Sequence, residues 1–296
     1  MPKDKEFPEI LSKDKSVNIQ KADPNAPPAD PKPAATVLLV RASNENIEVF
    51  MIKRNAKTNF GGAWVFPGGK LDPVDEEIEI NSFCSGLTDE MASQILGLKE
   101  GGLNYWIACI RECFEECGVL LAYRENGDFF GASDESEMNI LNSYQDRLNK
   151  GEPVLLELCK ELNLKLAVDR LAYVSHWVTP KMEMKRYSTR FFIALAPDDQ
   201  DAIHDGSEGV ESTWISPEEA LQKGKEGSFP IILPTIKNLE SIIGFSDTDS
   251  LLKNKVNYQN EVSSIEPKFF MENGKLVGLL PGCLLYTSPS PRDRVQ

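Results

Sequence analysis

The sequence lacks any long apolar segment. Among its 296 residues, no apolar run approaches the roughly 20 residues that a membrane-spanning helix requires. The N-terminal stretch MPKDKEFPEILSKDKSVNIQK has no apolar signal core, and its acidic residues argue against an Arg-rich transit peptide. We therefore expect a soluble, intracellular protein without a membrane span.

Basic residues and paired cysteine patterns are also scarce. The chain has 32 Lys and Arg against 46 Asp and Glu, a formal net charge of −14. A non-specific nucleic-acid binder needs basic patches, so this class is excluded. A small anionic ligand is still compatible, because a few local cations or a bound metal can reverse the charge within one pocket. The six cysteines form no disulfide framework, which fits a reducing compartment.

Composition divides the chain into three parts. Residues 1–33 are polar and rich in proline (KADPNAPPADPKP), and we interpret them as a disordered leader. Residues 34–282 have the composition of one folded domain. Residues 283–296 (CLLYTSPSPRDRVQ) differ in style from what precedes them, and we interpret them as a non-native tail. In that case the natural C-terminus, and any targeting signal in it, would be missing.

The middle of the chain alternates between strand and helix patterns. Two β-rich runs, 35–42 and 47–54, form a hairpin signal around SNEN. Further expected elements are a short strand within 61–69, a helix at 104–122, strands within 167–180 and 188–197, a strand leading into a helix within 211–224, and a helix at 233–244. This irregular alternation predicts an α/β layered domain with a mixed β-sheet.

The predicted helix at 104–122 carries an acidic stripe. On a helical wheel Glu115 and Glu116 fall within about 60° on either side of Glu112, opposite an apolar face. Like charges at this spacing destabilise a helix, and they lie near its C-terminal end, where the dipole also disfavours them. A divalent cation bound by oxygen ligands would offset both effects. A solvated acidic surface is the alternative. Gly118 is expected to end the helix.

The same helix contains a ladder of cysteines, Cys109, Cys113 and Cys117. A thiolate metal site is one interpretation of this spacing. The cysteines adjoin apolar residues, however, so we expect them to be small hydrophobic core residues. We also expect Trp64 and Phe66 to belong to the core.

Two separated motifs resemble the two halves of the Nudix box, G-x5-E-x7-R-E-U-x-E-E-x-G-U, where U is aliphatic. The first is FPGGKLDPVD, with Gly69 and Asp75, and the second is RECFEECGV, from Arg111 to Val119. The chain departs from the pattern in having Asp75 for glutamate and Cys113 for an aliphatic residue. It also has 35 residues between Asp75 and Arg111 where the pattern has 7. Such a split box resembles the Nudix-type motif 19 acyl-coenzyme A diphosphatases, and segments across about 34–282 agree.

The resemblance implies a Nudix α/β/α sandwich and a diphosphatase. The implied reaction is Mg²⁺- or Mn²⁺-dependent hydrolysis of coenzyme A and acyl-coenzyme A to 3′,5′-ADP and (acyl-)phosphopantetheine. It also implies a peroxisomal or mitochondrial location. Glu112 and Glu116 would be the principal metal ligands, completed by Glu115 and the Gly69 carbonyl. Arg111 would orient a glutamate. ADP-ribose or another nucleoside diphosphate derivative is an alternative substrate, and a non-catalytic binding module is a third possibility.

The remaining roles rest on position in the sequence. Glu208 is the preferred general base, ahead of Glu211 and the loop histidine His204. Arg54 is the preferred phosphate-binding residue. The other substrate-binding candidates are Gly68, Gly69 and Arg186, while for Lys53, Lys181, Lys185 and Arg190 a surface role is equally expected. We expect the inserted segment 76–103 to bind the acyl or pantetheine end of the substrate.

Overall fold

A computed structural model describes residues 22–23, 26–43, 46–58, 60–206, 208–272 and 275–280. The predicted tail at 283–296 and residues 1–21 of the predicted leader lie outside these ranges. The first strand begins at Lys32, so the last two residues of the predicted leader pair within the sheet. No helix in the described ranges is long and apolar enough to cross a membrane.

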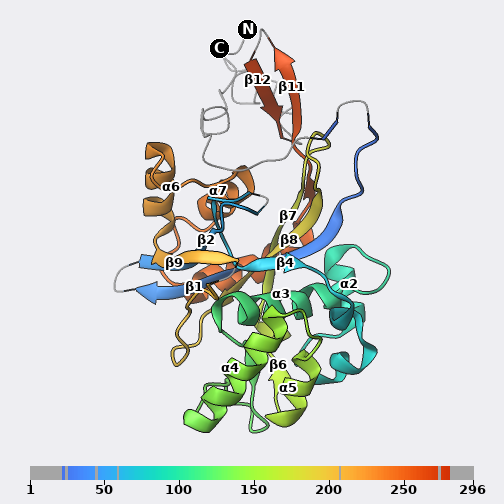
Figure 1. Cartoon of the computed structure of the whole chain (residues 1–296), viewed down its shortest axis with the longest axis vertical. Coiled ribbons are helices and arrows are strands. Elements are labelled where there is room, and N and C mark those ends of the chain that lie inside the picture. The colour runs from blue at the N-terminus through green and yellow to red at the C-terminus, as the bar shows by residue number, and fades with distance from the viewer. Residues whose placement is uncertain are drawn as a thin grey trace, which may run out of the picture.

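An eight-stranded mixed sheet forms the centre of the molecule (Figure 1). Its strands are β1 (Lys32–Ser43), β2 (Asn46–Arg54), β3 (Trp64–Val65), β4 (Gly68–Lys70), β7 (Ala172–Val178), β8 (Tyr187–Leu195), β9 (Gly209–Ile215) and β10 (Ser264–Ile265). The order is β10-β7-β8-β1-β2-β3, with β4 on β1 and β9 on β2. The pairs β1–β8 and β10–β7 are parallel and the other pairs are antiparallel. The predicted β1–β2 hairpin is confirmed.

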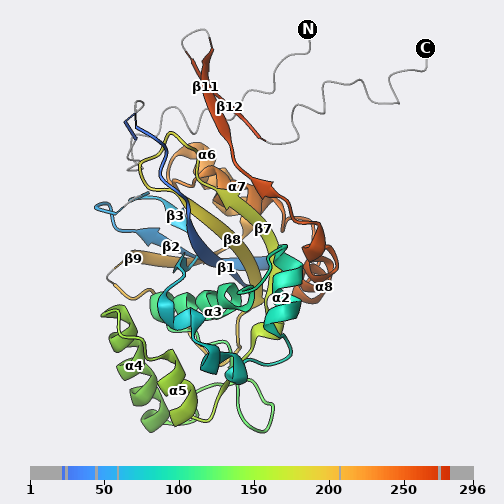
Figure 2. The same ribbon diagram turned by 90° about the vertical axis from the view of Figure 1, so that its right-hand side faces the viewer.

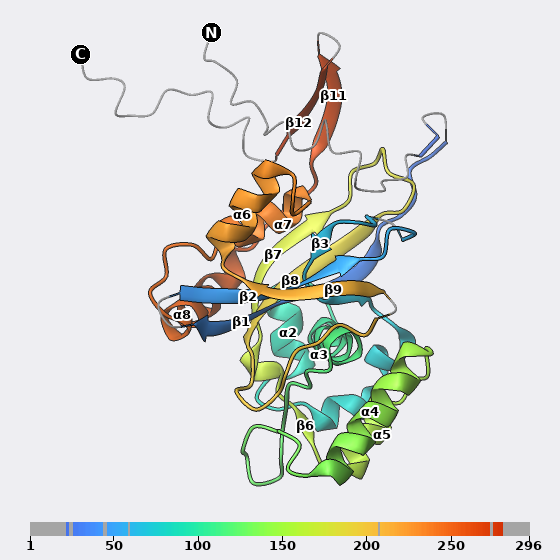
Figure 3. The same cartoon turned by 60° about the vertical axis from the view of Figure 1, so that its left-hand side comes forward.

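Helices cover both faces of this sheet (Figures 1 and 3). On one face lie α2 (Asp89–Leu96), α3 (Leu103–Cys117), α4 (Glu135–Asn149) and α5 (Leu155–Glu161), and on the other α6 (Pro217–Glu226), α7 (Leu233–Glu240) and α8 (Thr248–Tyr258). Each face has its own apolar core, one built around α3 and the other around α6, α7 and α8. The predicted α/β/α sandwich with a mixed sheet is therefore confirmed.

The smaller elements lie at the periphery. They are the 3₁₀ helices η1 (Pro73–Glu76), η2 (Ile78–Phe83), η3 (Val168–Arg170) and η4 (Gln259–Glu261), the pair β5 (Ala122–Tyr123) and β6 (Lys165–Leu166), and the pair β11 (Lys268–Glu272) and β12 (Lys275–Leu279). Strands β11 and β12 form an antiparallel pair that projects from the rest of the fold (Figure 2).

The glycine turn sits where β1 and β2 separate. β1 pairs with β2 through residues 40–43 and with β4 through residues 34–36. β2, in turn, pairs with β3 at Ile52 and Lys53. The connection from β3 to β4 therefore bridges the diverging strands. It places Gly68 and Gly69 at this opening, directly beside α3.

The predicted helix at 104–122 is shorter than expected. It begins at Leu103 and ends at Cys117, because Gly118 adopts a left-handed conformation with φ of 73° and donates its N–H to the Phe114 carbonyl. The glycine at this position was recognised as the stop signal, and the five residues beyond Cys117 do not continue the helix.

Candidate active site

The acidic stripe of α3 faces the protein interior. Glu112 is only 9% exposed and Glu116 only 7%, while Glu115 is half-buried. A solvated acidic surface, the alternative considered for this stripe, is therefore not what the fold builds. Burying ionisable groups is expensive unless hydrogen bonds or cations compensate, so the environment of these carboxylates determines what they can do.

The two halves of the split motif meet in space. The Gly68 N–H donates to a carboxylate oxygen of Glu116 at 2.8 Å, although 48 residues separate them. At Gly69 a Cβ atom would lie 2.4 Å from Glu112 Oε1, so any side chain at this position would displace the Glu112 carboxylate. The turn and the acidic helix thus form one site, and the long insertion does not separate them.

Arg111 connects the carboxylates of both halves. Its Nε and Nη2 donate to the two oxygens of Asp75 at 2.8 and 2.9 Å. Its Nη1 donates to Glu112 at 3.0 Å and to Glu115 at 3.1 Å, and Nη2 also reaches the Lys70 carbonyl at 2.9 Å. With these contacts the guanidinium is committed to the protein, and it fixes the orientation of Glu112 and Glu115.

Asp75 has a structural explanation that the sequence alone did not provide. Its carboxylate is fully buried, forms the bidentate pair with Arg111 and accepts the Asp72 N–H at 2.8 Å. Asp75 therefore holds Arg111, which in turn holds Glu112. The signal that could have suggested this was an acid at the acidic position of the first half, Asp75, together with the single arginine of the second half.

The acidic cluster is short of positive charge. Burial raises the pKa of Glu112 to about 8, because the neighbouring Arg111 offsets only part of the cost. Burial and the adjacent Glu112 raise the pKa of Glu116 well above its ordinary value, against Arg54 and the Gly68 N–H, which lower it. Burial also raises the pKa of Glu115. A cation placed among these groups would favour their ionised forms.

The donor set fits a divalent cation. Glu112 and Glu116 are buried oxygen donors, and the positive charge near them is too small to balance both as carboxylates. The Gly69 backbone lies against Glu112. Within the described part of the chain, no three His, Cys, Asp or Glu side chains are already arranged as a ligand set. The reason is visible in the contacts, since Arg111 holds Glu112 and Glu115 while the Gly68 N–H holds Glu116.

The loop between β8 and β9 lies against the C-terminal end of α3. The N–H groups of Ile203 and Asp205 donate to the carbonyls of Cys117 and Glu116 at 3.1 and 3.0 Å. Glu208 follows in this loop and pairs with Arg54 at 3.3 Å, with its side chain 60% exposed. Glu208 also acts electrostatically on Glu115 and Glu116, so the structure brings it to the edge of the acidic cluster.

The guanidinium of Arg54 is only partly hydrogen-bonded within the described part of the protein. Its Nη2 contacts Glu208, but its Nε is buried and has no hydrogen-bond partner among the described residues. A buried donor without an acceptor costs free energy, so this atom is suited to an acceptor from outside the chain. His204, in the same loop as Glu208, hydrogen-bonds through Nδ1 with the hydroxyl of Ser212 in β9 at 2.8 Å.

Other candidates occupy different surroundings. Arg186 is buried and donates to the Thr179 and Ala29 carbonyls and to Glu266. All three nitrogens of its guanidinium therefore have protein acceptors just before β8, and its predicted contact with the substrate stays a prediction. Lys53 pairs with Glu211 at 3.1 Å, and both are solvent-accessible. Neither contact involves the acidic helix.

The predicted core residues are confirmed. Cys109, Cys113 and Cys117 are fully buried in the apolar core, and burial holds the pKa of Cys109 well above its usual range. Trp64 and Phe66 are 4% and 2% exposed in the opposite core. These thiols therefore act as small hydrophobic residues.

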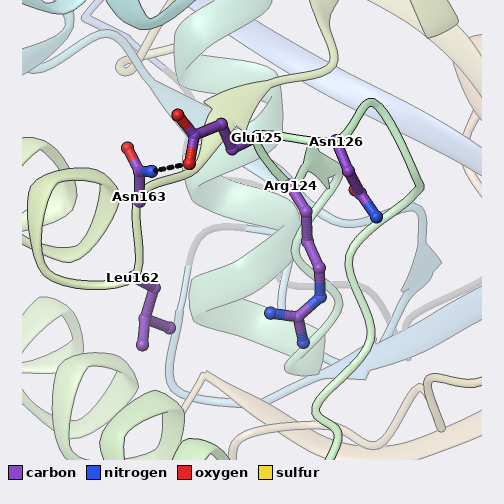
Figure 4. Close-up of a pocket in the computed structure, with 5 residues that line it drawn as sticks. All are labelled: Arg124, Glu125, Asn126, Leu162 and Asn163. Carbon is purple, nitrogen blue, oxygen red and sulfur yellow. Dashed lines mark hydrogen bonds between the residues drawn. The ribbon is translucent and has the colours of Figure 1, made fainter.

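A wide, open hollow of 510 Å³ lies at a distance from this chemistry in the fold, between β5 and the end of α5 (Figure 4). Its lining residues are Arg124, Glu125, Asn126, Leu162 and Asn163. Arg124 donates to both oxygens of Glu137, and Asn163 donates to Glu125 at 2.9 Å. None of the acidic trio lines it.

Comparisons with known proteins agree with this geometry. Two family models match, the NUDT19 Nudix domain over residues 98–242 and the NUDIX domain over residues 30–155. The chain is 26% identical over 278 residues to acyl-coenzyme A diphosphatase NUDT19 of Xenopus laevis, covering 82% of this chain and 72% of that protein. It is 25% identical over 298 residues to the Homo sapiens protein of the same name, covering 89% and 76%.

A solved structure supports the same fold. The crystal structure of a NUDIX hydrolase from Alicyclobacillus acidocaldarius matches with a TM-score of 0.63 and 23% sequence identity. The match covers 76% of this chain and 96% of that one.

Proposed function

Because this chain belongs to the Nudix hydrolases and is a diphosphatase of that superfamily, we propose that it hydrolyses the pyrophosphate bond of coenzyme A and acyl-coenzyme A. The products would be 3′,5′-ADP and (acyl-)phosphopantetheine. The observation that carries the proposal is the meeting of the glycine turn with the buried carboxylates Glu112 and Glu116. The names of the relatives support the choice of substrate.

A divalent cation, Mg²⁺ or Mn²⁺, would be held by Glu112 and Glu116, with Glu115 and the Gly69 carbonyl completing the set. When bound, such an ion neutralises phosphate charge and lowers the pKa of a bound water. Arg111 would keep Glu112 in position through its contacts with Asp75, without touching the substrate. The pyrophosphate would lie against the glycine turn.

Two residues at the edge of the cluster would act on the substrate and the water. Arg54 would donate its unpartnered Nε–H to a phosphate oxygen. Glu208 would accept the proton of the attacking water as the new phosphorus–oxygen bond forms and the bridging bond breaks. Substrate binding would first exchange the Arg54–Glu208 ion pair for a phosphate contact, which frees Glu208 to act as the base.

The substrate assignment is tested by product analysis with Mg²⁺ or Mn²⁺ over coenzyme A, an acyl-coenzyme A, ADP-ribose and NADH. We expect 3′,5′-ADP and phosphopantetheine from coenzyme A with a higher kcat/KM than for the other compounds. Efficient cleavage of ADP-ribose without cleavage of coenzyme A would replace the proposal by the ADP-ribose alternative.

The role of the carboxylates is tested by Glu116→Gln. Loss of groups that merely support metal ligands costs 10–100-fold, so loss of a ligand is expected to lower kcat by more than about 100-fold. Glu240→Gln, on the exposed partner of Lys237 in α7, is the control and should retain activity. Unchanged circular dichroism would show that the fold is intact, and a fully active Glu116→Gln enzyme would refute the metal assignment.

A further inference from the structure

A second cavity lies on the sheet face opposite α3. Its volume is 140 Å³ and its floor is formed by β7 and β8. Aromatic and proline side chains dominate its lining, among them Phe60, Trp177, Tyr187, Phe191, Pro180 and Pro234. Helix α7, whose first turn supplies Pro234, packs against β7 on this side of the sheet (Figure 3). We call this space the Trp177 cavity.

Two of the residues that line the Trp177 cavity carry a polar atom without a protein partner. Trp177 is 4% exposed, and its Nε1 is buried without a hydrogen-bond acceptor among the described residues. Glu183 also lines the cavity, and its Oε2 is buried without a donor among the same residues. Unsatisfied buried polar atoms cost free energy and are uncommon in folded proteins. One donor and one acceptor thus lie unpaired at the edge of an otherwise apolar space.

The Trp177 cavity is close to the glycine turn. Thr36 of β1 is in register with Gly68 on one side and with Phe191, which lines the cavity, on the other. Two strand spacings therefore separate Gly68 from Phe191, roughly 10 Å. The ring of Phe66, just before the glycine turn, also packs edge to face on Phe191, with the ring centroids 6.5 Å apart. Along the sheet the glycine turn and the cavity are therefore neighbours, and Phe66 connects them on the face that carries the cavity.

The size and lining of the cavity favour an aromatic ring. An apolar cavity of about 150 Å³ is known to hold a benzene ring, so 140 Å³ suits one ring system with an open side better than a long flexible chain. Aromatic rings and prolines offer flat apolar surfaces for stacking. The indole N–H can only donate. Burial raises the pKa of Glu183 to about 7, and above that pH its carboxylate can only accept. A heterocycle with a ring nitrogen and an exocyclic amine satisfies both.

We propose that the Trp177 cavity binds the adenine base of the substrate, with Trp177 donating to a ring nitrogen and Glu183 accepting from the exocyclic amine. This inference rests on the proposed function, which supplies an adenine-containing diphosphate. It adds the residues that recognise the base. Phe60 would close the cavity from the loop between β2 and β3, where it adopts a left-handed φ of 59° that is uncommon for a non-glycine residue.

The test measures binding of adenosine 5′-monophosphate and inosine 5′-monophosphate to the full chain by calorimetry, with Mg²⁺ present. Neither compound contains a pyrophosphate, so neither is consumed. Trp177→Phe keeps the ring and removes only the N–H, and we expect about tenfold weaker binding of adenosine 5′-monophosphate. Trp214→Phe on β9 is the matched control and should bind like the wild type.

Glu183→Gln tests the second contact. The wild type should prefer the adenine nucleotide, because inosine has a carbonyl where adenine has its amine. A glutamine amide can donate to that carbonyl, so the preference should fall about tenfold or reverse. Phosphopantetheine, which lacks a base, should bind all variants equally.

Two results would overturn the inference. If Trp177→Phe and Glu183→Gln both bind adenosine 5′-monophosphate like the wild type, the cavity does not hold the base. If these two variants instead lose affinity for phosphopantetheine, the cavity holds the pantetheine arm. These results are independent of the proposed function, because a protein that fails to cleave coenzyme A can still show adenine binding that depends on Trp177.

Discussion

At the scale of single residues, the site depends on how one arginine is shared. Arg111 is 3% exposed and is bound to Asp75, Glu112 and Glu115 at once. Glu112 and Glu115 belong to the acidic stripe of α3, whereas Asp75 lies before the insertion at 76–103. The geometry of the proposed metal ligands is therefore set by a residue that neither binds the metal nor touches the substrate.

Asp75→Asn should weaken both stability and activity. Breaking a buried ion pair by removing one partner costs about 3–5 kcal/mol, and the remaining contacts of Arg111 place the loss at the lower end. We expect the free energy of unfolding, from urea denaturation, to fall by about 3 kcal/mol and kcat to fall at least tenfold.

The control is Asp72→Asn. Asp72 Oδ2 lies 3.7 Å from Nη1 of Arg111, but the Asp72 side chain is 53% exposed. An exposed pair of this kind contributes less than about 1 kcal/mol. Equal losses in the two variants would show that Asp75 is not the residue that fixes Arg111.

At the scale of elements, the insertion is part of the framework of the site. Asp89 in α2 accepts hydrogen bonds from the Gly101 and Leu103 N–H groups, at 3.0 and 2.9 Å, and so caps the start of α3. Ile80 and Ala92 are fully buried in the core around α3. Deleting residues 76–103 would damage this core. Its proposed role in substrate binding has to be tested by point variants.

Asp89→Ala should destabilise α3 by removing its cap. Loss of a capping carboxylate costs about 0.5–2 kcal/mol, and we expect a fall of this size in urea denaturation. Glu90→Ala, on the exposed neighbour in the same helix, is the control. A similar fall for both variants would contradict a capping role specific to Asp89.

Ile78 is the residue through which the insertion is best placed to bind an acyl chain. It is 86% exposed and follows Asp75 by three residues. We expect Ile78→Ser to lower kcat/KM for a long-chain acyl-coenzyme A several-fold while leaving that for free coenzyme A unchanged. Val256→Ser, an exposed apolar residue of α8 on the other sheet face, is the control. If Ile78→Ser leaves the ratio of kcat/KM for the long-chain acyl-coenzyme A to kcat/KM for free coenzyme A unchanged, the insertion does not bind the acyl chain through Ile78.

Local patterns predicted much of this fold. The β1–β2 hairpin and the end of α3 at Gly118 depend on neighbours in sequence, so their signals are strong. Helix α4 was missed because only Leu141, Tyr144 and Leu148 are buried along its 15 residues, which leaves a narrow apolar stripe. The pairing of Asp75 with Arg111 and the Asp89 cap join distant residues, and no periodicity reports such contacts.

At the scale of the whole molecule, the buried carboxylates link stability to pH. The pKa of Glu112, about 8, is raised above its unfolded value, so the metal-free folded chain holds a proton that the unfolded chain releases. This stability is complete below the unfolded pKa of about 4.3 and is lost as pH rises through 8. A bound cation would instead require ionised carboxylates and bind more tightly at high pH.

We expect the urea midpoint in EDTA to fall between pH 6 and pH 9, and Mg²⁺ or Mn²⁺ to restore it most at pH 9. A metal at 100 times its Kd would add about 2.7 kcal/mol. The double variant Glu112→Gln, Glu116→Gln should lose the metal effect and show a smaller fall with pH, because the pKa values of Glu115 and Glu183 are also raised. A wild-type midpoint that is flat in EDTA would contradict strongly protonated carboxylates.

The parallel pairing of β1 with β8 has a consequence for synthesis. Lys32 pairs with Tyr187, and nine successive residues of β1 from there to Val40 lie beside β8. At about 5–20 residues per second, a ribosome needs roughly 8–30 seconds between making the two strands. During that interval the apolar edge of the first hairpin is open to other nascent chains. The β1 edge is therefore a site where the partly synthesised chain can aggregate before β8 covers it.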